Sequence, residues 1–397
     1  MVRRVTFFVV VGAVLCLVLT ASTVQAQTPV KVGETFTYSA TTPHPYPVGD
    51  ESRPAVWTDV VKSPGATFTR IHFSEFNLAP GDYVTIRGGG EEHRYEGTGP
   101  RGTGEFWGFS TDGDIAIVQL HGGRAMGHGY TIDKIGHGTL PAAVLEEPTP
   151  EVICGTDGRK AVACYTSPPK STWNPVARLL YTDDGGGLFV CTGSLVRGSN
   201  ASTLITNNHC IDSQTETNSL QARFNYQKKN CNGNQQDPAS NYNGGTLLRT
   251  SPLCGGLDYT LVTLLGNPEG AWGEFIPTSL QPAATNTMFF PQHPGGGLKK
   301  LGKFEDKQQL ILCDVTAVGL TFNPAGCGQS TTPNSQFSYG CDSEGGSSGS
   351  PILKGDASKV WGLHHLANVS FPSCDNGGTL MSFICSNAGS LLQCDSN

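Results

Sequence analysis

Residues 340–351 read Gly-Cys-Asp-Ser-Glu-Gly-Gly-Ser-Ser-Gly-Ser-Pro, and the prediction of fold and chemistry starts from this stretch. Its core is a glycine-rich turn that places Ser348 between small residues. A nucleophilic serine needs such a turn, because its Oγ must be accessible and neighbouring N–H groups must point at the attacked carbonyl. Gly346 and Gly349 permit the required backbone dihedrals. Gly/Ser-rich stretches are also common as linkers, so the turn alone leaves both interpretations open.

Two motifs upstream favour the nucleophile. His209 stands in Asn-His-Cys at the end of the expected strand 204–208, and Asp258 stands at the head of an apolar strand that runs to Val262. A carboxylate at the head of such a strand is partly buried, which is unfavourable unless a partner shares its charge. The imidazole of His209 is the candidate partner for Asp258.

Residues 1–26 have the pattern of a secretory signal. Arg3 and Arg4 precede an apolar run at 7–19, and small residues lead to a cleavage site after Ala26. A membrane anchor is the alternative, but the apolar run is short for a span. We therefore predict a secreted, extracellular protein without a membrane anchor.

The cysteines favour disulfides over metal. Of 13 cysteines, Cys16 lies in the signal and the other twelve fall between Cys154 and Cys394. An even number in an exported chain predicts a disulfide framework, and no spacing typical of zinc sites occurs. The scattered histidines at 121, 128 and 137 are expected to be solvated, so no metal site is predicted. A net charge of −7 without basic runs argues against nucleic acid as a partner.

The composition, with 51 glycines and 25 prolines, predicts a turn-rich β protein of two domains. In residues 27–140 alternating patterns predict strands at 67–76, 83–86, 114–120 and 129–135, with a further one at 104–109, which favours a β-sandwich. Residues 141–151 are rich in proline and acidic residues and read as an exposed linker, where a propeptide would also be cut. Residues 152–397 form the second domain.

Four motifs in the second domain carry a resemblance to a known family. They are Cys-Thr-Gly-Ser-Leu at 191–195, Asn-His-Cys at 208–210, Asp-Tyr-Thr-Leu at 258–261 and Gly-Gly-Ser-Ser-Gly-Ser-Pro at 345–351. In this order they resemble the chymotrypsin-like (trypsin-like) serine proteases, and most of all the bacterial lysyl and glutamyl endopeptidases. The separations of 49 residues from His209 to Asp258 and 90 from Asp258 to Ser348 agree with the family. The expected fold is all-β, with an N-terminal jelly-roll-like β-sandwich followed by a chymotrypsin-like double β-barrel.

The resemblance implies a role for each motif residue. Ser348 would attack the scissile carbonyl of a protein or peptide, His209 would transfer the proton, and Asp258 would orient His209. The N–H groups of Gly346 and Ser348 would form the oxyanion hole, and no cofactor is expected. The implied disulfides are Cys191–Cys210, Cys154–Cys374 and Cys164–Cys231. Six further cysteines allow 15 pairings: Cys254, Cys313, Cys327, Cys341, Cys385 and Cys394.

The sequence departs from the family in two places. Asn207 and Asn208 replace the usual alanines before the histidine, which adds polar groups near the site. Ser347 stands where digestive relatives keep an aspartate that receives the new N-terminus, so activation here should not depend on a buried amino terminus. The first domain, by residues 73–86 and its Gly-Tyr-Thr-Ile strand, resembles a CUB-like jelly roll without the usual disulfides. Such domains commonly bind proteins or glycans.

The specificity residues point in two directions. Asp342 and Ser343 stand where trypsin-like enzymes keep an Asp-Ser pair in the primary pocket, which favours Lys or Arg at P1. Asp375, after Cys374, is the other candidate carboxylate. Against these, His364 aligns with the histidine that glutamyl enzymes use with a nearby hydroxyl to hold a substrate carboxylate.

His365 instead aligns with a histidine of the lysyl enzymes. Glu151-Val152 would suit glutamyl self-processing, and no lysine lies between Lys134 and Lys160. A preference for Lys or Arg is the expectation, with a glutamyl-specific enzyme as the alternative and an inactive, protease-like binding protein as a third. Whether residues 27–151 are removed on maturation stays open.

Overall fold

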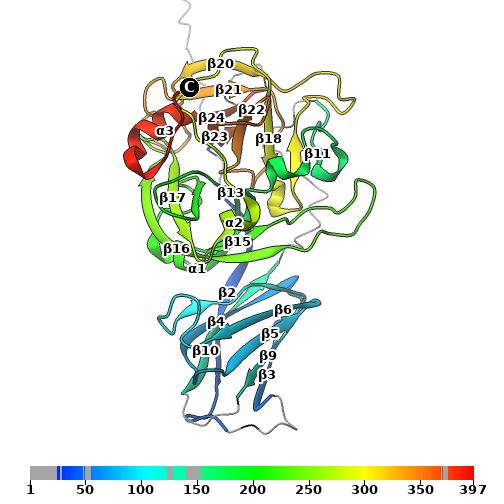
Figure 1. Cartoon of the computed structure of the whole chain (residues 1–397), viewed down its shortest axis with the longest axis vertical. Coiled ribbons are helices and arrows are strands. Elements are labelled where there is room, and N and C mark those ends of the chain that lie inside the picture. The colour runs from blue at the N-terminus through cyan, green and yellow to red at the C-terminus, as the bar shows by residue number, and fades with distance from the viewer. Residues whose placement is uncertain are drawn as a thin grey trace, which may run out of the picture.

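The computed structural model of the chain describes residues 25–26, 29–47, 49, 55–122, 128–139, 153, 155–367, 369 and 374–397. Strands are far more common than helices among these residues, and a sandwich lies below two barrels in Figure 1. The α-helices of the described residues are α1 (Gln214–Ser219), α2 (Pro268–Trp272) and α3 (Met381–Ala388). The expected all-β class is confirmed.

The first domain is a sandwich of two antiparallel layers. One layer contains β2 (Val30–Thr41), β10 (Gly129–Gly138) and β4 (Phe68–Asn77), with the short β7 (Phe106–Trp107) and β8 (Thr111–Asp112) on β4. The other has the order β3 (Trp57–Lys62), β9 (Ile115–His121), β5 (Tyr83–Gly88) and β6 (Glu91–Glu96). Four of the five strands predicted in this half lie in β4, β5, β9 and β10. The fifth shrinks to the two residues of β7.

The period-two pattern of β9 shows why these segments form strands. Ala116, Val118 and Leu120 are fully buried, whereas Ile115 and Ile117 face outward. Side chains alternate between the faces of a strand, so one face of β9 enters the core between the layers. Each buried aliphatic side chain stabilises the fold by roughly 1.5–3 kcal/mol.

The first barrel of the second domain is closed by six strands. They are β12 (Val176–Thr182), β13 (Gly187–Leu195), β14 (Thr203–Thr206), β15 (Gln221–Phe224), β16 (Ser240–Ser251) and β17 (Tyr259–Leu264). Pairing of β12 with both β13 and β15 closes the barrel. Strand β2 also pairs with β13, so one sandwich layer continues into the barrel sheet. The sequence did not predict this continuity.

The second barrel is an open half-barrel. Its order is β11 (Lys160–Ala161), β19 (Lys300–Gly302), β18 (Met288–Gln292), β22 (Pro351–Lys354), β23 (Val360–Ala367), β24 (Asn376–Leu380), β21 (Gln336–Tyr339) and β20 (Val315–Leu320). The two-residue strand β1 (Gln25–Ala26) pairs with β23. Helix α3 lies beside this barrel near the C-terminus (Figure 1).

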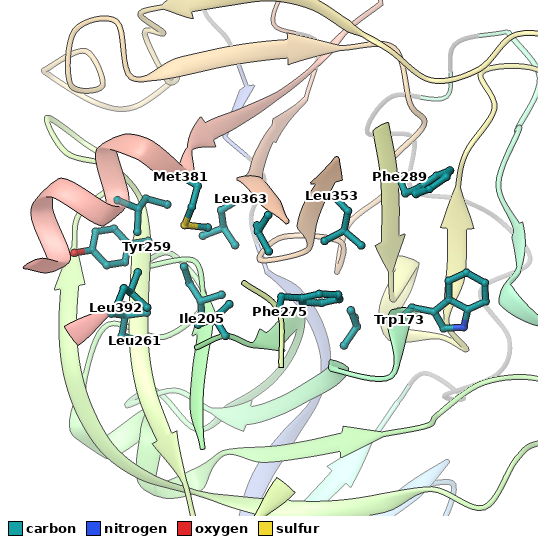
Figure 2. Packing of buried hydrophobic residues seen from close by; sticks show 14 of the residues in the cluster. Trp173, Ile205, Tyr259, Leu261, Phe275, Phe289, Leu353, Leu363, Met381 and Leu392 are labelled. Carbon is teal, nitrogen blue, oxygen red and sulfur yellow. The ribbon is translucent and has the colours of Figure 1, made fainter. Parts of the chain in front are cut away.

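A hydrophobic core joins the two barrels. Figure 2 shows Ile205 and Leu261 of the first barrel facing Leu363 of the second barrel and Met381 of α3, with Phe275 beside Ile205. All five are buried. This packing fixes the barrels relative to each other, so residues at the seam can form one site.

Five disulfides lie within the described residues. Cys191–Cys210 and Cys164–Cys231 pair as expected. Cys154 lies outside the described residues, so its pairing with Cys374 stays a prediction. The other three bridges are Cys254–Cys327, Cys313–Cys341 and Cys385–Cys394.

The described residues contain no group of three or more His, Cys, Asp or Glu side chains that could hold a metal ion. In the same part of the chain, no helix has the length and apolar character needed to cross a membrane.

Candidate active site

Ser348 lies in the turn between β21 and β22, at the seam of the barrels. Gly346 and Gly349 on either side of it have φ of +88° and +85°, a region that favours glycine. A Cβ on Gly349 would lie 2.1 Å from the carbonyl oxygen of Thr192. The carbonyl of Ser348 accepts a hydrogen bond from the N–H of Thr192 at 2.9 Å. The glycine-rich stretch is therefore a built turn and not a linker.

His209 follows β14 and is held by its neighbours on both sides. Cys210 is bonded to Cys191 of β13, and the backbone N–H of His209 donates to Oδ1 of Asp258 at 3.0 Å. Nδ1 of its ring lies 2.7 Å from Oδ2 of the same carboxylate. Because an ionised carboxylate only accepts hydrogen bonds, this ring nitrogen is the donor. The two motifs that the sequence singled out thus meet in a two-point contact.

Asp258 comes directly before β17 and is completely buried. Its φ of +49° is unusual for a residue other than glycine. Asn207 donates from Nδ2 to the carbonyl of Asp258 at 2.8 Å, which helps to hold this backbone. Burial alone would raise the pKa of Asp258, but contacts with His209 and His365 hold it well below its usual range. The carboxylate is therefore ionised at neutral pH.

His365 of β23 is a second histidine on this carboxylate. Its Nδ1 lies 3.1 Å from Oδ2 of Asp258, and its Nε2 lies 2.6 Å from Oε1 of Gln336. Burial lowers the pKa of His365 despite the attraction of Asp258. His365 thus does more than line the strand, because it helps to fix the carboxylate that orients His209. No local motif pointed to Gln336.

The remaining ring nitrogen of His209, Nε2, is buried and makes no hydrogen bond to a described residue. A general base must offer this atom to the nucleophile. The carbonyl of Ser348 is hydrogen-bonded to Thr192 on β13. Thr192 follows Cys191, whose disulfide partner Cys210 follows His209.

The residues that depart from the family also make contacts, although Oδ1 of Asn207 is buried without a hydrogen bond to a described residue. Asn208 donates from Nδ2 to Oγ1 of Thr250 at 2.8 Å, so its polar group points away from the His209 ring contact. Ser347 donates from Oγ to Oε1 of Gln292 at 2.6 Å. The side chain at position 347 is therefore paired with the neutral amide of Gln292 and not with a charged amino terminus.

The beginning of the second domain holds the loop before Ser348. The N–H of Gly158 donates to Oδ2 of Asp342 at 2.7 Å, and Nη2 of Arg159 lies 3.0 Å from Oε2 of Glu344. Arg159 and Glu344 have side chains only 1% and 6% exposed. Sequence reasoning missed this ion pair, because 185 residues separate its partners.

The expected pocket residues gather at the base of this loop. Asp342 and Ser343 are fully buried, and Ser343 donates from Oγ to Oδ1 of Asn376 at 2.7 Å. The carboxylate of Glu305 packs on Gly340, where a Cβ would lie 2.2 Å from Oε1. Burial raises the pKa of Glu305, and so do the negative charges of Asp314, Asp375 and Asp342. Several carboxylates therefore share this region.

His364 is on the other side of the same loop. It is fully buried, makes an edge contact with Phe290 at 4.7 Å between ring centres, and bonds through Nδ1 to the hydroxyl of Tyr339. Its Nε2 faces the backbone of Gly377 without a hydrogen bond of normal geometry to any described residue. Burial, together with His365 and His209, lowers its pKa well below the usual range. His364 is therefore neutral here.

Comparison with known proteins agrees with this geometry. The family model described as "Lysyl endopeptidase, C-terminal domain" matches residues 156–366, more than half of the chain. A relative named Secreted RxLR effector protein 73, from Plasmopara viticola, is 30% identical over 325 residues, which cover 76% of this chain and 75% of that protein.

Solved structures show similar folds at low identity. The active form of a protease from M. tuberculosis is 15% identical and covers 64% of this chain and 96% of its own, with a TM-score of 0.41. A Glu endopeptidase in complex with MPD is 20% identical and covers 60% of this chain and 97% of its own, with a TM-score of 0.38. By its family match, the chain belongs to the lysyl endopeptidase C-terminal domain family of trypsin-like serine proteases.

Proposed function

We propose that this protein is a secreted serine endopeptidase in which Ser348 is the nucleophile, His209 the general base and Asp258 the residue that orients the base. The observation that carries the proposal is the two-point contact of His209 with a buried, ionised Asp258 beside the Ser348 turn. This contact fixes the proton on Nδ1 and leaves Nε2 to accept a proton.

The reaction then has two halves. Oγ of Ser348 bonds to the substrate carbonyl carbon as its proton moves to Nε2 of His209, and that proton passes to the leaving amine when the C–N bond breaks. Water repeats the sequence on the acyl-enzyme, which releases the acid and restores Ser348. The N–H groups of Gly346 and Ser348 would stabilise the oxyanion, where one donor is typically worth about 3 kcal/mol.

A preference for Lys or Arg at P1 is supported by charge. The negative charges of Asp314, Asp375 and Asp342 all act on the carboxylate of Glu305 near the Ser348 loop. Such a region attracts a cationic side chain and repels a substrate carboxylate.

Glutamate at P1 is the second candidate, and His364 is the observation in its favour. A neutral histidine whose buried Nε2 makes no hydrogen bond to a described residue could gain a proton when a substrate carboxylate arrives. The charges around Glu305 weigh against this candidate.

Digestion of a denatured protein, with the cut sites read by mass spectrometry, tests both candidates. We expect cuts mainly after Lys and Arg. In the Asp342→Ser variant, cleavage after Lys and Arg relative to other residues should fall at least tenfold. Cuts mainly after Glu, abolished in His364→Ala, would replace the first candidate with the second. No cutting by the folded protein would favour a binding role.

We also infer that the sandwich is an accessory domain or a pro-region. Sequencing the N-terminus of protein purified from culture medium distinguishes these two. A start near residue 27 means that the sandwich is kept, and a start between about 140 and 153 means that it is removed. The resemblance to protein- or glycan-binding CUB-like domains stays a prediction.

A further inference from the structure

The Ser348 turn lies between the edges of two strands, one from each barrel. On β13, the N–H of Thr192 donates to the carbonyl of Ser348 at 2.9 Å. On β23, His364 donates from its N–H to the carbonyl of Ser350 and accepts at its carbonyl from the N–H of Gly349, both at 3.0 Å.

The N-terminal segment of the chain occupies both edges. On β23, Gln25 and Ala26 pair with Ala367 and Leu366. On β13, Val30 and Lys31 of β2 pair with Val190 and Phe189. Both pairings are antiparallel.

These pairings lie close to the nucleophile. Residues two apart on a strand are separated by about 7 Å and direct their N–H and C=O groups to the same edge. Val190 is two residues from Thr192 on β13, whereas on β23 a break in the pairing register lies between His364 and Leu366. Ala26 and Val30 are four residues apart, so their Cα atoms are separated by at most about 14 Å. The β1 pairing on β23 and the β2 pairing on β13 are therefore close to each other.

The burial of the site agrees with a covered nucleophile. Ser348 is 0% exposed, and the side chain of His209 is only 10% exposed. An endopeptidase must admit an extended peptide on both sides of the cleaved bond. Extended peptides commonly bind by adding a strand to an exposed sheet edge.

We propose that the N-terminal strand β2 acts as a built-in inhibitor, because it fills the edge of β13 beside Ser348 along which an extended peptide would pair. This inference rests on the proposed function, because it identifies the competitor for the same site. After β13, β2 continues into the sandwich and pairs with β10 from Gly33 to Thr41. The sandwich therefore tethers the inhibitory segment.

Removal of a leader after Ala26 would take β1 away and leave β2 in place. The β13 side then stays covered while the Ser348 turn opens to small molecules. A small probe and a long peptide should consequently report differently on the same chain.

The test compares four chains: the chain from Gln27, its Val30→Pro and Val30→Thr variants, and a chain that begins at Val32. Proline lacks the N–H that pairs with Val190, whereas threonine keeps it and matches valine in shape. The probes are a fluorophosphonate and internally quenched peptides with Lys or Glu at the centre. Because Val30→Pro can disturb folding, the chain from Val32 provides the second measurement.

We expect the fluorophosphonate to label every chain at Ser348. The kcat/KM for the quenched peptide should be at least tenfold higher for Val30→Pro and for the chain from Val32 than for the other two. Equal kcat/KM in all labelled chains would overturn the inhibitor and leave the proposed function intact. No labelling of any chain would overturn the proposed function, and the inference with it.

Discussion

At the residue scale, the carboxylate of Asp258 accepts hydrogen bonds from three N–H groups. Two come from His209, at 3.0 and 2.7 Å, and one from His365, at 3.1 Å. A buried charge persists only when it is paired in this way. The sequence indicated Asp258 and His209, because a carboxylate at the head of an apolar strand needs a partner. It could not indicate that His365 would share the same oxygen.

Asp258→Asn should lower kcat/KM by about 10⁴ at neutral pH while the chain stays folded. The amide is uncharged, so it cannot stabilise the imidazolium and can turn its NH₂ toward Nδ1 of His209. Initial rates on a peptide substrate measure the loss, and circular dichroism checks the fold. The matched control is Asp356→Asn, which makes the same change at an exposed aspartate. A variant that keeps more than a tenth of the activity would contradict the role of Asp258.

Lys299 gives a separate prediction about pH and stability. It is fully buried, and its Nζ donates to the carbonyl of Trp173 at 3.0 Å. Burial lowers the pKa of Lys299 from 10.5 to about 7, although Asp237 opposes this shift. Between these values the unfolded chain binds more protons than the folded one. The contribution of Lys299 to stability therefore rises with pH in this window, by up to about 1.4 kcal/mol per pH unit.

Lys299→Met should remove this rise. Urea unfolding at pH 7 and pH 9 measures it, and the stability of the wild type relative to the variant should increase by about 2–3 kcal/mol between the two pH values. Lys354→Met, at an exposed lysine, serves as control. An unchanged difference at the two pH values would show that Lys299 is charged in the folded protein.

At the element scale, local sequence patterns predicted the strands, but they did not predict which distant strands pair with each other. The alternation in β9 and β4 identifies a half-buried strand because each face has one environment. Nothing in residues 30–41 indicates that β2 joins a barrel strand more than 150 residues away in the sequence. The three disulfides among the six cysteines without an implied partner could not be predicted either, because sequence alone cannot choose among 15 pairings.

The segment at 157–159 and the Ser348 loop form another long-range pair. Arg159 contacts Asp157 through Nε and Nη2 at 2.9 and 3.0 Å, and Nη2 also contacts Glu344 at 3.0 Å. This internal cation holds the loop where digestive relatives use a new amino terminus. Because residue 347 is a serine and not an aspartate, the sequence predicts that activation does not use a new amino terminus.

Arg159→Met should lower the free energy of unfolding by about 3–5 kcal/mol, because it leaves Glu344 buried without its partner. The kcat should fall as well, since the displaced loop carries Ser348. The double variant Arg159→Met/Glu344→Met should recover most of the stability. Urea denaturation of the two single variants and the double variant measures the coupling, and additive losses would mean that the pair does not act as a unit.

At the scale of the whole molecule, the sandwich is packed onto the first barrel. Val32 and Phe68 of the sandwich share a buried cluster with Leu180, Leu188 and Val190 of the barrel. A second contact is made by a buried arginine, Arg70, whose Nη2 donates to the carbonyl of Ser219 at 2.6 Å. The linker composition predicted two domains, but it did not predict that they share a core.

A chain that begins at residue 153 should be less stable than the full chain. Loss of the sandwich exposes Leu180, Leu188 and Val190, and each fully buried aliphatic side chain contributes roughly 1.5–3 kcal/mol. We expect a lower Tm and a smaller soluble fraction, measured by differential scanning fluorimetry and by yield. Leu188→Ser in the shortened chain should restore solubility. Equal Tm values would mean that the shared cluster adds nothing to the barrel.

The most direct test of the account is the position of a fluorophosphonate label. The reagent is applied to the chain that begins at Val32, and the labelled peptide is identified by mass spectrometry after proteolysis. We predict one labelled residue, Ser348, with labelling abolished in Ser348→Ala and at least 10³-fold slower in His209→Ala. A label on another serine, or the same labelling rate in folded His209→Ala, would contradict the assignment of Ser348 and His209 as nucleophile and base.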